Sequence, residues 1–320
     1  MNLPAELGLA MSKALDGVDH RALSDVANEI STAYRAQRRS GSAYLTSHAH
    51  RLAYLAVRLP ATYAAVLSAC SYTADIVGDV PIRSCLDLGA GPGTASWAVA
   101  QTWSRIERVT HVERDDDLIR LGKQLAAQGD DRLKNADWQC ADLTALETLE
   151  SHDLVICSYA IGELTEADRD RLVEKAWSAA RALLILIEPG TVPGFQRILS
   201  ARHQLLEAGA HLVAPCPHED ACPMTGVDWC HFAQRLDRSA IHRQIKSVDL
   251  GYEDEKYAYV VVARDEVVRP TARVLRHPQK RSGHTHLSLC TIEGIENRTV
   301  TRSQKSDWKR VRRTGWGDTW

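Results

Sequence analysis

The sequence predicts an α/β protein built on an open, doubly wound sheet, and three observations lead to this prediction. Short apolar runs alternate with helical stretches from Ile82 to Arg264, which is the pattern of repeated strand–helix units. The run Leu183–Ile187 has no polar alternation, as expected of a strand buried on both faces of a parallel sheet. A glycine-rich turn separates the first run from a helical stretch, as in the first unit of a doubly wound sheet.

Six apolar runs are predicted strands, because each is short and bounded by turn residues. They are Ser84–Leu88, Val109–Glu113, Trp138–Ala141, Leu154–Tyr159, Leu183–Glu188 and Tyr257–Ala263. Two helices are predicted among the later strands. One begins at a capping box over Thr165–Asp168, and the other carries an apolar stripe from Ile198 to Leu206 that stops at Gly209.

The chain divides into three predicted regions. Residues 1–80 form an N-terminal helical region, and residues 81–264 form the α/β domain, which is interrupted by a loop at 211–250. Residues 265–320 form a basic C-terminal segment. Composition changes at each boundary, so we expect each region to have its own role.

The two flanking regions contain weaker structural signals. Apolar residues recur at helical spacing from Leu23 to Ile30, and a second N-terminal helix is expected to end near Pro60. The C-terminal segment contains two strand-like pieces, Ala272–Leu275 and Thr285–Cys290, followed by a polar end.

The net charge of −2 hides an uneven distribution along the chain. From Arg264 to Trp320 there are 13 Lys and Arg against 6 Asp and Glu, a balance of +7, whereas the other residues hold 26 against 35, a balance of −9. A positive segment on a negative body predicts a surface that faces phosphate groups. A solvated, partly disordered tail would show the same pattern, and charge alone leaves the two equally open.

Composition also predicts the compartment. No run approaches the roughly 18 apolar residues of a transmembrane helix, and the first residues lack a basic start followed by an apolar core. The chain contains eight cysteines, which in a reducing compartment are buried or bind metals. We therefore expect a cytoplasmic protein that is monomeric and has no membrane partner.

The turn after the first predicted strand points to a nucleoside ligand. Its sequence, DLGAGPGT over residues 87–94, resembles motif I of class I methyltransferases, and its glycines let the backbone approach a ligand closely. Glu113 ends the next strand, twenty positions after Gly93, where a carboxylate can accept both ribose hydroxyls. Gly93 follows Gly91 by only one intervening residue, which favours S-adenosylmethionine over NAD. A tight turn whose glycines serve packing alone is the alternative.

Two more strand ends complete the predicted cofactor site. Asp142 and Leu143 follow the third strand, where the same fold places an acid beside the adenine amine, and Ser158 ends the fourth. The predicted cofactor-binding residues are Asp87, Gly89, Ala90, Gly91, Gly93, Thr94, Glu113, Asp142, Leu143 and Ser158. No catalytic residue is predicted, because the segment SYAIGE at 158–163 lacks the Asn/Asp-Pro-Pro-Tyr motif of amino-methylating enzymes. Whether a methyl group is transferred stays open.

Four cysteines point to a metal. Cys216, Cys222 and Cys230 lie in a loop rich in Pro and Gly, and Cys290 lies further on, with five, seven and 59 residues between successive cysteines. Zinc fingers favour two to four intervening residues, so the spacing favours an iron–sulfur cluster over zinc. His218 and His231 keep a zinc site of three cysteines and one histidine as the alternative. The other four cysteines are expected to be buried thiols; they are Cys70, Cys85, Cys140 and Cys157.

Taken in order, these features resemble the methyltransferase-like family of mitochondrial small-ribosomal-subunit assembly factors, and the chain looks like a bacterial-type member. The likeness covers the chain from about residue 40 onwards and is most specific in the cysteine block. The segments that carry it are Leu86–Thr94, Ser158–Leu164, Glu188–Thr191, Ala214–His218, Cys222–Pro223, Asp228–Phe232, Gly251–Lys256 and Arg276–His284.

The resemblance implies a [4Fe–4S] cluster, S-adenosylmethionine as cofactor, and the small ribosomal subunit and its rRNA as partners. The implied cluster ligands are Cys216, Cys222, Cys230 and Cys290. The residues expected to contact RNA phosphates are Arg276, Lys280, Arg281, Lys309, Arg310, Arg312 and Arg313. Trp308, Trp316 and Trp320 lie among them. They are expected to cover a small core, and stacking on unpaired bases is the alternative. An active rRNA base methyltransferase and a zinc-stabilised RNA-binding module with a vestigial pocket are the alternative functions.

Overall fold

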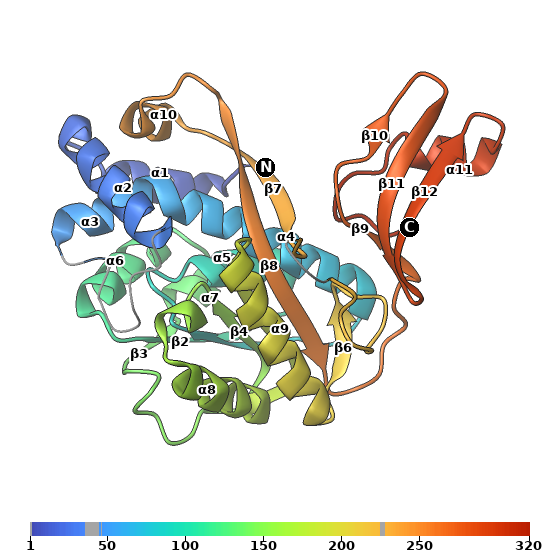
Figure 1. The fold of residues 1–320 in the computed structure, drawn as a ribbon. Coiled ribbons are helices and arrows are strands. Elements are labelled where there is room, and N and C mark those ends of the chain that lie inside the picture. Colours follow the sequence, from blue (N-terminus) through green and yellow to red (C-terminus); the bar gives the residue numbers. More distant parts are fainter. Residues whose placement is uncertain (1, 36–44, 46, 225–227) are drawn as a thin grey trace.

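A mixed sheet of eight strands forms the centre of the protein (Figure 1). The computed structural model describes residues 2–35, 45, 47–224 and 228–320. The strands are β1 Ser84–Leu88, β2 Arg108–Glu113, β3 Asp137–Cys140, β4 His152–Ser158, β5 Ala180–Pro189, β6 His211–Ala214, β7 Phe232–Asp237 and β8 Tyr252–Ala263. Their order is β3-β2-β1-β4-β5-β8-β6, and β7 pairs with the first half of β8. The first five strands are parallel, whereas β8 is antiparallel to β5 and β6.

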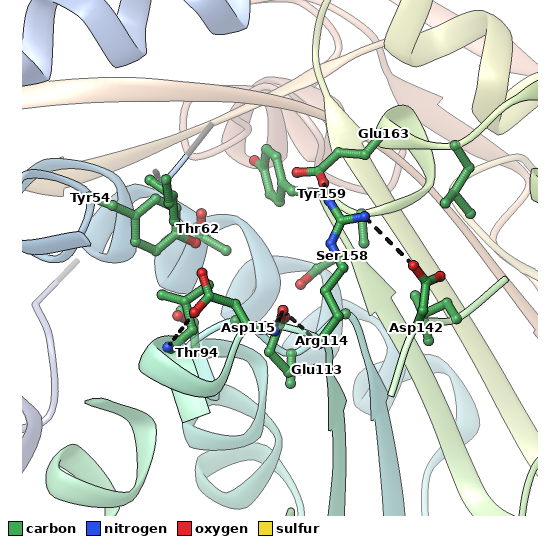
Figure 2. A pocket seen from close by; sticks show the side chains of 18 of the residues that line it. Tyr54, Thr62, Thr94, Glu113, Arg114, Asp115, Asp142, Ser158, Tyr159 and Glu163 are labelled. Atoms are coloured by element: carbon green, nitrogen blue, oxygen red, sulfur yellow. Dashed lines mark hydrogen bonds and ion pairs between the residues drawn. The ribbon is translucent and has the colours of Figure 1, made fainter. Parts of the chain in front are cut away.

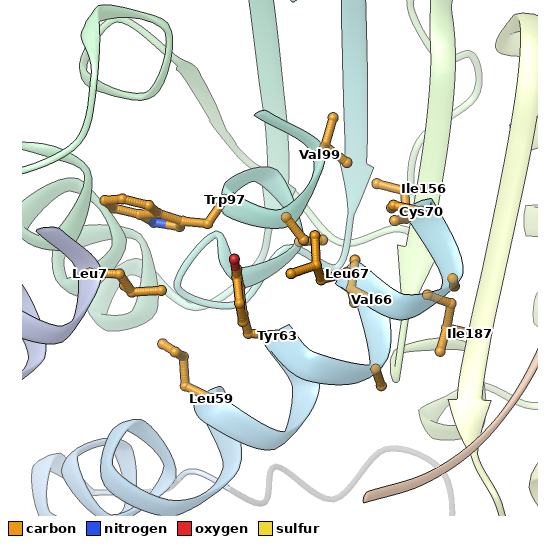
Figure 3. Packing of buried hydrophobic residues seen from close by; sticks show 14 of the residues in the cluster. Leu7, Leu59, Tyr63, Val66, Leu67, Cys70, Trp97, Val99, Ile156 and Ile187 are labelled. Carbon is orange, nitrogen blue, oxygen red and sulfur yellow. The ribbon is translucent and has the colours of Figure 1, made fainter. Parts of the chain in front are cut away.

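Helices cover both faces of this sheet and bury its alternating side chains. The helices of the α/β region are α5 Thr94–Thr102, α6 Asp116–Ala126, α7 Asp131–Lys134, α8 Glu166–Ala179, α9 Val192–Glu207 and α10 Ala240–Lys246, with a 3₁₀ turn, η2, at Ile161–Glu163. On β5, Ile185 and Ile187 join the core under the N-terminal helices (Figure 3), whereas Leu184 and Leu186 join a second core under α8 and α9. Successive side chains of a strand point to opposite faces of the sheet, which explains why neighbouring residues of β5 belong to different cores. Because helices cover both faces, the predicted doubly wound sheet is confirmed.

The predicted strands and helices are largely found where the sequence places them. All six predicted strands exist, and β1 has the predicted bounds. The Thr165 side chain accepts a hydrogen bond from the Asp168 amide at 3.2 Å, so the capping box begins α8 as predicted. The prediction of a loop over 211–250 was wrong in part, because β6, β7 and α10 lie within it. These elements are too short or too polar to show a period. Pairing with β8 stabilises β6 and β7, whereas α10 packs against α2 and η1.

The N-terminal region consists of helices that pack on one face of the sheet. They are α1 Ala5–Ala14, α2 His20–Arg35, α3 His48–Ala53, a π-helical segment η1 at Tyr54–Arg58, and α4 Leu59–Val77. The prediction that a helix ends near Pro60 was wrong, since α3, η1 and α4 are continuous. The π-helical segment ends at Arg58, and α4 begins at Leu59. Pro60 therefore lies in the first turn of α4, where the missing backbone N–H of a proline is tolerated.

Among the described residues, one helical run has the length and composition of a membrane span, which the sequence analysis does not predict. His48–Val77 is long and apolar enough to cross a membrane by length and composition, with a mean hydropathy of 1.3. However, 83% of its most apolar window is buried inside the protein. That burial is typical of a core helix, which meets apolar side chains on every face.

The C-terminal segment forms a second, smaller sheet with its own core. Its elements are β9 Ala272–Val274, β10 Gln279–Lys280, β11 His284–Thr291, β12 Gly294–Thr301 and α11 Lys305–Val311. Strand β11 pairs antiparallel with the other three strands. Val274, Leu289 and Val311 are fully buried in a core that also includes Trp320, as predicted for this tryptophan. The sequence had predicted β9 and β11 but neither β12 nor α11.

Candidate functional site

A pocket lies where the carboxyl ends of β1 to β4 meet (Figure 2), which is where open α/β sheets bind ligands. Eight of the ten predicted cofactor-binding residues line it; they are Gly89, Ala90, Gly91, Thr94, Glu113, Asp142, Leu143 and Ser158. The structure therefore brings together residues from four separate strand ends. Asp87 is fully buried, and His111 Nδ1 lies 3.5 Å from its Oδ2. Gly93 lies behind the turn against Trp138.

The glycine turn needs glycine at two positions for different reasons. Gly89 has φ +68°, and a Cβ there would stand 2.5 Å from the Ala160 Cβ, so its lack of a side chain allows the turn to pack against the end of β4. Gly91 has φ +55°, but no atom lies within 4 Å of its missing Cβ. A left-handed backbone beside open space is what a close ligand approach requires.

Glu113 holds the turn in place from the end of β2. Its carboxylate accepts hydrogen bonds from the amides of Gly91, Arg114 and Asp115 at 2.8, 2.9 and 3.0 Å. Burial raises the pKa of Glu113, and these three hydrogen bonds oppose that shift. A carboxylate offers about four acceptor sites, so about one is left. The predicted contact with both ribose hydroxyls would therefore require Glu113 to give up a backbone partner.

The sequence missed several lining residues. Tyr54 and Thr62 come from the N-terminal helices, and Arg114, Asp115, Tyr159 and Glu163 come from the segments after β2 and β4. No local pattern marks Tyr54 and Thr62, because their place depends on how the helices pack. The N-terminal region therefore supplies one wall of the pocket. On the other side, Tyr159 after β4 has φ +59°, a strained conformation for a non-glycine residue that is common at functional sites.

Arg114 extends across the pocket between two carboxylates (Figure 2). Its guanidinium lies 3.3 Å from Glu163 Oε2 and 3.9 Å from Asp142 Oδ2. Burial raises the pKa of Glu163 to about 7, although Arg114 opposes the shift. Hydrogen bonds from the Thr144 amide and hydroxyl lower the pKa of Asp142. Asp142 is therefore an ionised acceptor, whereas Glu163 changes protonation near neutral pH.

The four predicted ligand cysteines line a second pocket. Cys216 and Cys222 follow β6, Cys230 precedes β7, and Cys290 lies on β11 of the C-terminal sheet. Burial raises the pKa of the Cys230 thiol, and the other three thiols raise it further. Burial and two of these neighbours also raise the pKa of Cys290 to about 12. The fold thus gathers four cysteines, three from the loop after β6 and one from β11, around one cavity.

Of the two histidines considered as zinc ligands, one lies near a cysteine sulfur of the pocket and the other stacks on a tryptophan, and one of the four cysteines expected to be buried is exposed. His218 Nε2 lies 3.8 Å from Cys290 Sγ, whereas the His231 ring stacks on Trp229 at 5.0 Å and its Nδ1 contacts a backbone carbonyl. Within the described part of the chain, no group of three or more Cys, His, Asp or Glu is close enough to hold a single metal ion. Three of the other cysteines are buried as predicted, but Cys140 is exposed because it lies on the edge strand β3.

The predicted RNA-contacting residues separate into two groups. Arg276 faces inward, where its guanidinium pairs with Asp228 and donates to the Trp229 carbonyl at 3.1 Å. The others lie on the outside of the C-terminal sheet and α11. Lys309, Arg310 and Arg313 line a shallow groove, the Lys280 ammonium donates to the Arg312 carbonyl at 2.9 Å, and Arg281 is exposed.

Fold and pocket together define a class I methyltransferase-like protein: a parallel sheet with one antiparallel strand inserted beside β5, and a glycine-turn pocket at its carboxyl edge. The model of the family described as "Mitochondrial small ribosomal subunit Rsm22" matches residues 48–320. The chain belongs to this family.

Individual relatives are more distant. The chain is 25% identical over 287 residues to the human "Ribosome assembly protein METTL17, mitochondrial", covering 83% of this chain and 61% of that protein. It is 28% identical over 319 residues to "Rsm22-cox11 tandem protein 2, mitochondrial" of Schizosaccharomyces pombe, covering 83% of this chain and 42% of that one. The chain thus spans only part of both relatives. Both are described as mitochondrial, and the cytoplasmic location of this chain stays a prediction.

Among solved structures, magnesium protoporphyrin IX methyltransferase from Synechocystis with bound S-adenosylmethionine is 15% identical, with a TM-score of 0.43 over 78% of this chain and 99% of that one. A likeness of this degree carries no argument. The fold assignment rests on the strand order.

We predict that Glu163→Gln stabilises the protein at about pH 8 and has little effect at about pH 4. A carboxyl whose folded pKa is raised destabilises the fold above that pKa, and the effect vanishes below the unfolded value of 4.5. The melting temperature of the variant should exceed that of the parent by about 2–4 °C at the higher pH. Glu174→Gln, at an exposed position on α8, is the control. Parallel pH profiles for parent and Glu163→Gln would contradict the prediction.

Proposed function

We propose that the chain binds S-adenosylmethionine in the glycine-turn pocket, holds a [4Fe–4S] cluster with Cys216, Cys222, Cys230 and Cys290, and acts in assembly of the small ribosomal subunit through contacts with its rRNA. One observation carries the proposal most strongly. Three cysteines of one loop and Cys290, 60 positions further along the chain, line one pocket in a chain that belongs to a small-subunit family.

The glycine-turn pocket fits an adenosyl ligand. Gly91 leaves space where a Cβ would stand, and Asp142 offers an ionised carboxylate at the end of β3, where an adenine amine can donate to it. Glu163 lines the same cavity, and its ionised form suits the positive charge of a sulfonium. Bound S-adenosylmethionine would supply an electrophilic methyl group.

The cysteine pocket fits a cluster better than a single zinc ion. Zinc requires four ligand atoms at about 2.0–2.3 Å from one point, and the described residues contain no group that tight. In a [4Fe–4S] cluster each cysteine binds a different iron atom, so the four sulfur atoms surround a core and stand further apart. Four cysteines around one cavity suit that arrangement, and each would bind iron as a thiolate.

Binding of S-adenosylmethionine tests the first pocket. Gly91→Ala should abolish binding, because its Cβ enters the space that the ligand needs, while stability falls by only about 1–2 kcal/mol from the left-handed backbone. Gly209→Ala is the matched control, since Gly209 has φ +77° and equally open surroundings at the end of α9. Calorimetric titration and thermal unfolding of both variants check this. Equal affinity in the two variants would contradict the predicted site.

Metal analysis tests the second pocket. Protein purified without oxygen should be brown and contain iron and acid-labile sulfide, and Cys290→Ser should lose most of both, because it removes the one ligand on the C-terminal sheet. Cys140→Ser replaces an exposed cysteine on β3 and should retain the parent content. A parent protein with zinc alone would reject the cluster.

Binding to small-subunit rRNA tests the outer basic surface. Lys309→Ala combined with Arg313→Ala removes two charges from the groove on α11 and should lower the slope of log affinity against log salt by about 2. Arg120→Ala removes an exposed charge on α6, far along the chain from this surface, and should leave the slope unchanged. An unchanged slope in the double variant would exclude the groove as a phosphate contact.

A further inference from the structure

Two arginines are buried beside the four cysteines. Arg202 of α9 and Arg273 of β9 are 5% and 4% exposed, and both line the cysteine pocket. Burying an unpaired charge costs several kcal/mol, so buried arginines normally have a carboxylate partner. Among the ion pairs of the described residues, none involves either guanidinium. Their charges therefore lack a counter-charge within contact distance.

Arg202 connects α9 to the cysteine loop. Its Nη2 donates to the carbonyls of His218 and Asp220 at 3.0 and 2.9 Å, which fixes the segment between Cys216 and Cys222. Its Nε is buried and has no partner. Arg202 and Cys216 line the same pocket. The guanidinium is thus held at the cysteine loop by two carbonyls and still has one free donor.

Arg273 approaches from the opposite side, on the C-terminal sheet. It stands directly across from Cys290 in the β9–β11 pairing, and side chains of such a pair lie on the same face. Its Nη2 donates to the Tyr259 hydroxyl at 2.8 Å, and its guanidinium carbon lies 3.2 Å from the centroid of the Tyr72 ring. Its Nε and Nη1 are buried and have no partner.

We infer that Arg202 and Arg273 are the charge partners of an anionic metal–thiolate centre held by the four cysteines, an inference that rests on the proposed cluster. Four thiolates around an oxidised [4Fe–4S] core leave two net negative charges, and two guanidiniums offset them. Their unpaired N–H groups can donate to thiolate or sulfide sulfur. Hydrogen bonds and charges around a cluster tune its stability and reduction potential. Both arginines are positioning residues, since the cysteines make the bonds to iron.

The test compares Arg202→Gln and Arg273→Gln with Arg202→Lys and Arg273→Lys in the full chain purified without oxygen. Each glutamine variant should hold iron about 10- to 100-fold more weakly against a chelator. The midpoint potential of the cluster should shift to more negative values, because removal of a positive charge disfavours the added electron. The lysine variants keep the charge and should recover most of the potential, which a purely structural role would not produce.

Arg264→Gln is the matched control. Arg264 donates to the carbonyls of Ala180 and Trp177 and stacks on the Trp177 ring, so it makes the same kinds of contact as the two arginines. It is exposed and lies outside the cysteine pocket. It should leave iron retention and potential unchanged. Glutamine variants that fold and show the parent's iron retention and potential would overturn the inference and leave the proposed function intact. A parent without iron would instead overturn the proposed cluster itself.

Discussion

The junction between the C-terminal sheet and the α/β region depends on polar contacts around the cysteine pocket. The buried residues of the two regions form separate apolar cores, and Trp316 is a C-terminal residue that packs against the larger one. Arg273 binds the Tyr259 hydroxyl, Arg276 binds the Trp229 carbonyl, and the Trp316 indole donates to the His231 carbonyl at 3.1 Å. Such contacts each contribute only about 0.5–1.5 kcal/mol net. A centre bonded to cysteines on both sides would dominate this junction.

Strand β8 connects the junction to the other pocket. Glu255, Tyr257 and Tyr259 alternate along it and therefore share one face. Glu255 accepts a hydrogen bond from the Tyr159 hydroxyl at 3.0 Å beside the glycine-turn pocket, and Tyr259 receives Arg273 at the cysteine pocket. Between them, the Tyr257 hydroxyl donates to Ser68 of α4 at 2.8 Å. One strand, paired on both sides, thus fixes the distance between the two sites.

Local patterns predicted the parts of this protein that local chemistry determines. The bounds of β1, the glycine turn and the capped start of α8 follow from residues close together in the sequence. The positions of Tyr54 and Thr62 in the pocket wall cannot be predicted in this way. They depend on how the N-terminal helices pack against the glycine turn, which lies in a later part of the chain. The meeting of Cys290 with the other cysteines was likewise expected from family resemblance rather than from spacing. Arg202 and Arg273 carried no signal, since nothing distinguishes a buried arginine from an exposed one in a sequence.

The structure also changes the meaning of the basic C-terminal charge. The net charge of this segment, in which every Lys and Arg has the same weight, predicted a surface that faces phosphate groups. In the fold, Arg273 and Arg276 turn inward toward the cysteine pocket and the loop around it, whereas Lys309 and Arg313 line an outer groove. The inward arginines are committed to contacts within the chain and add little to nucleic-acid binding. If the cysteines bind an anionic cluster, part of the charge that resembles an RNA-binding signal compensates charge inside the protein.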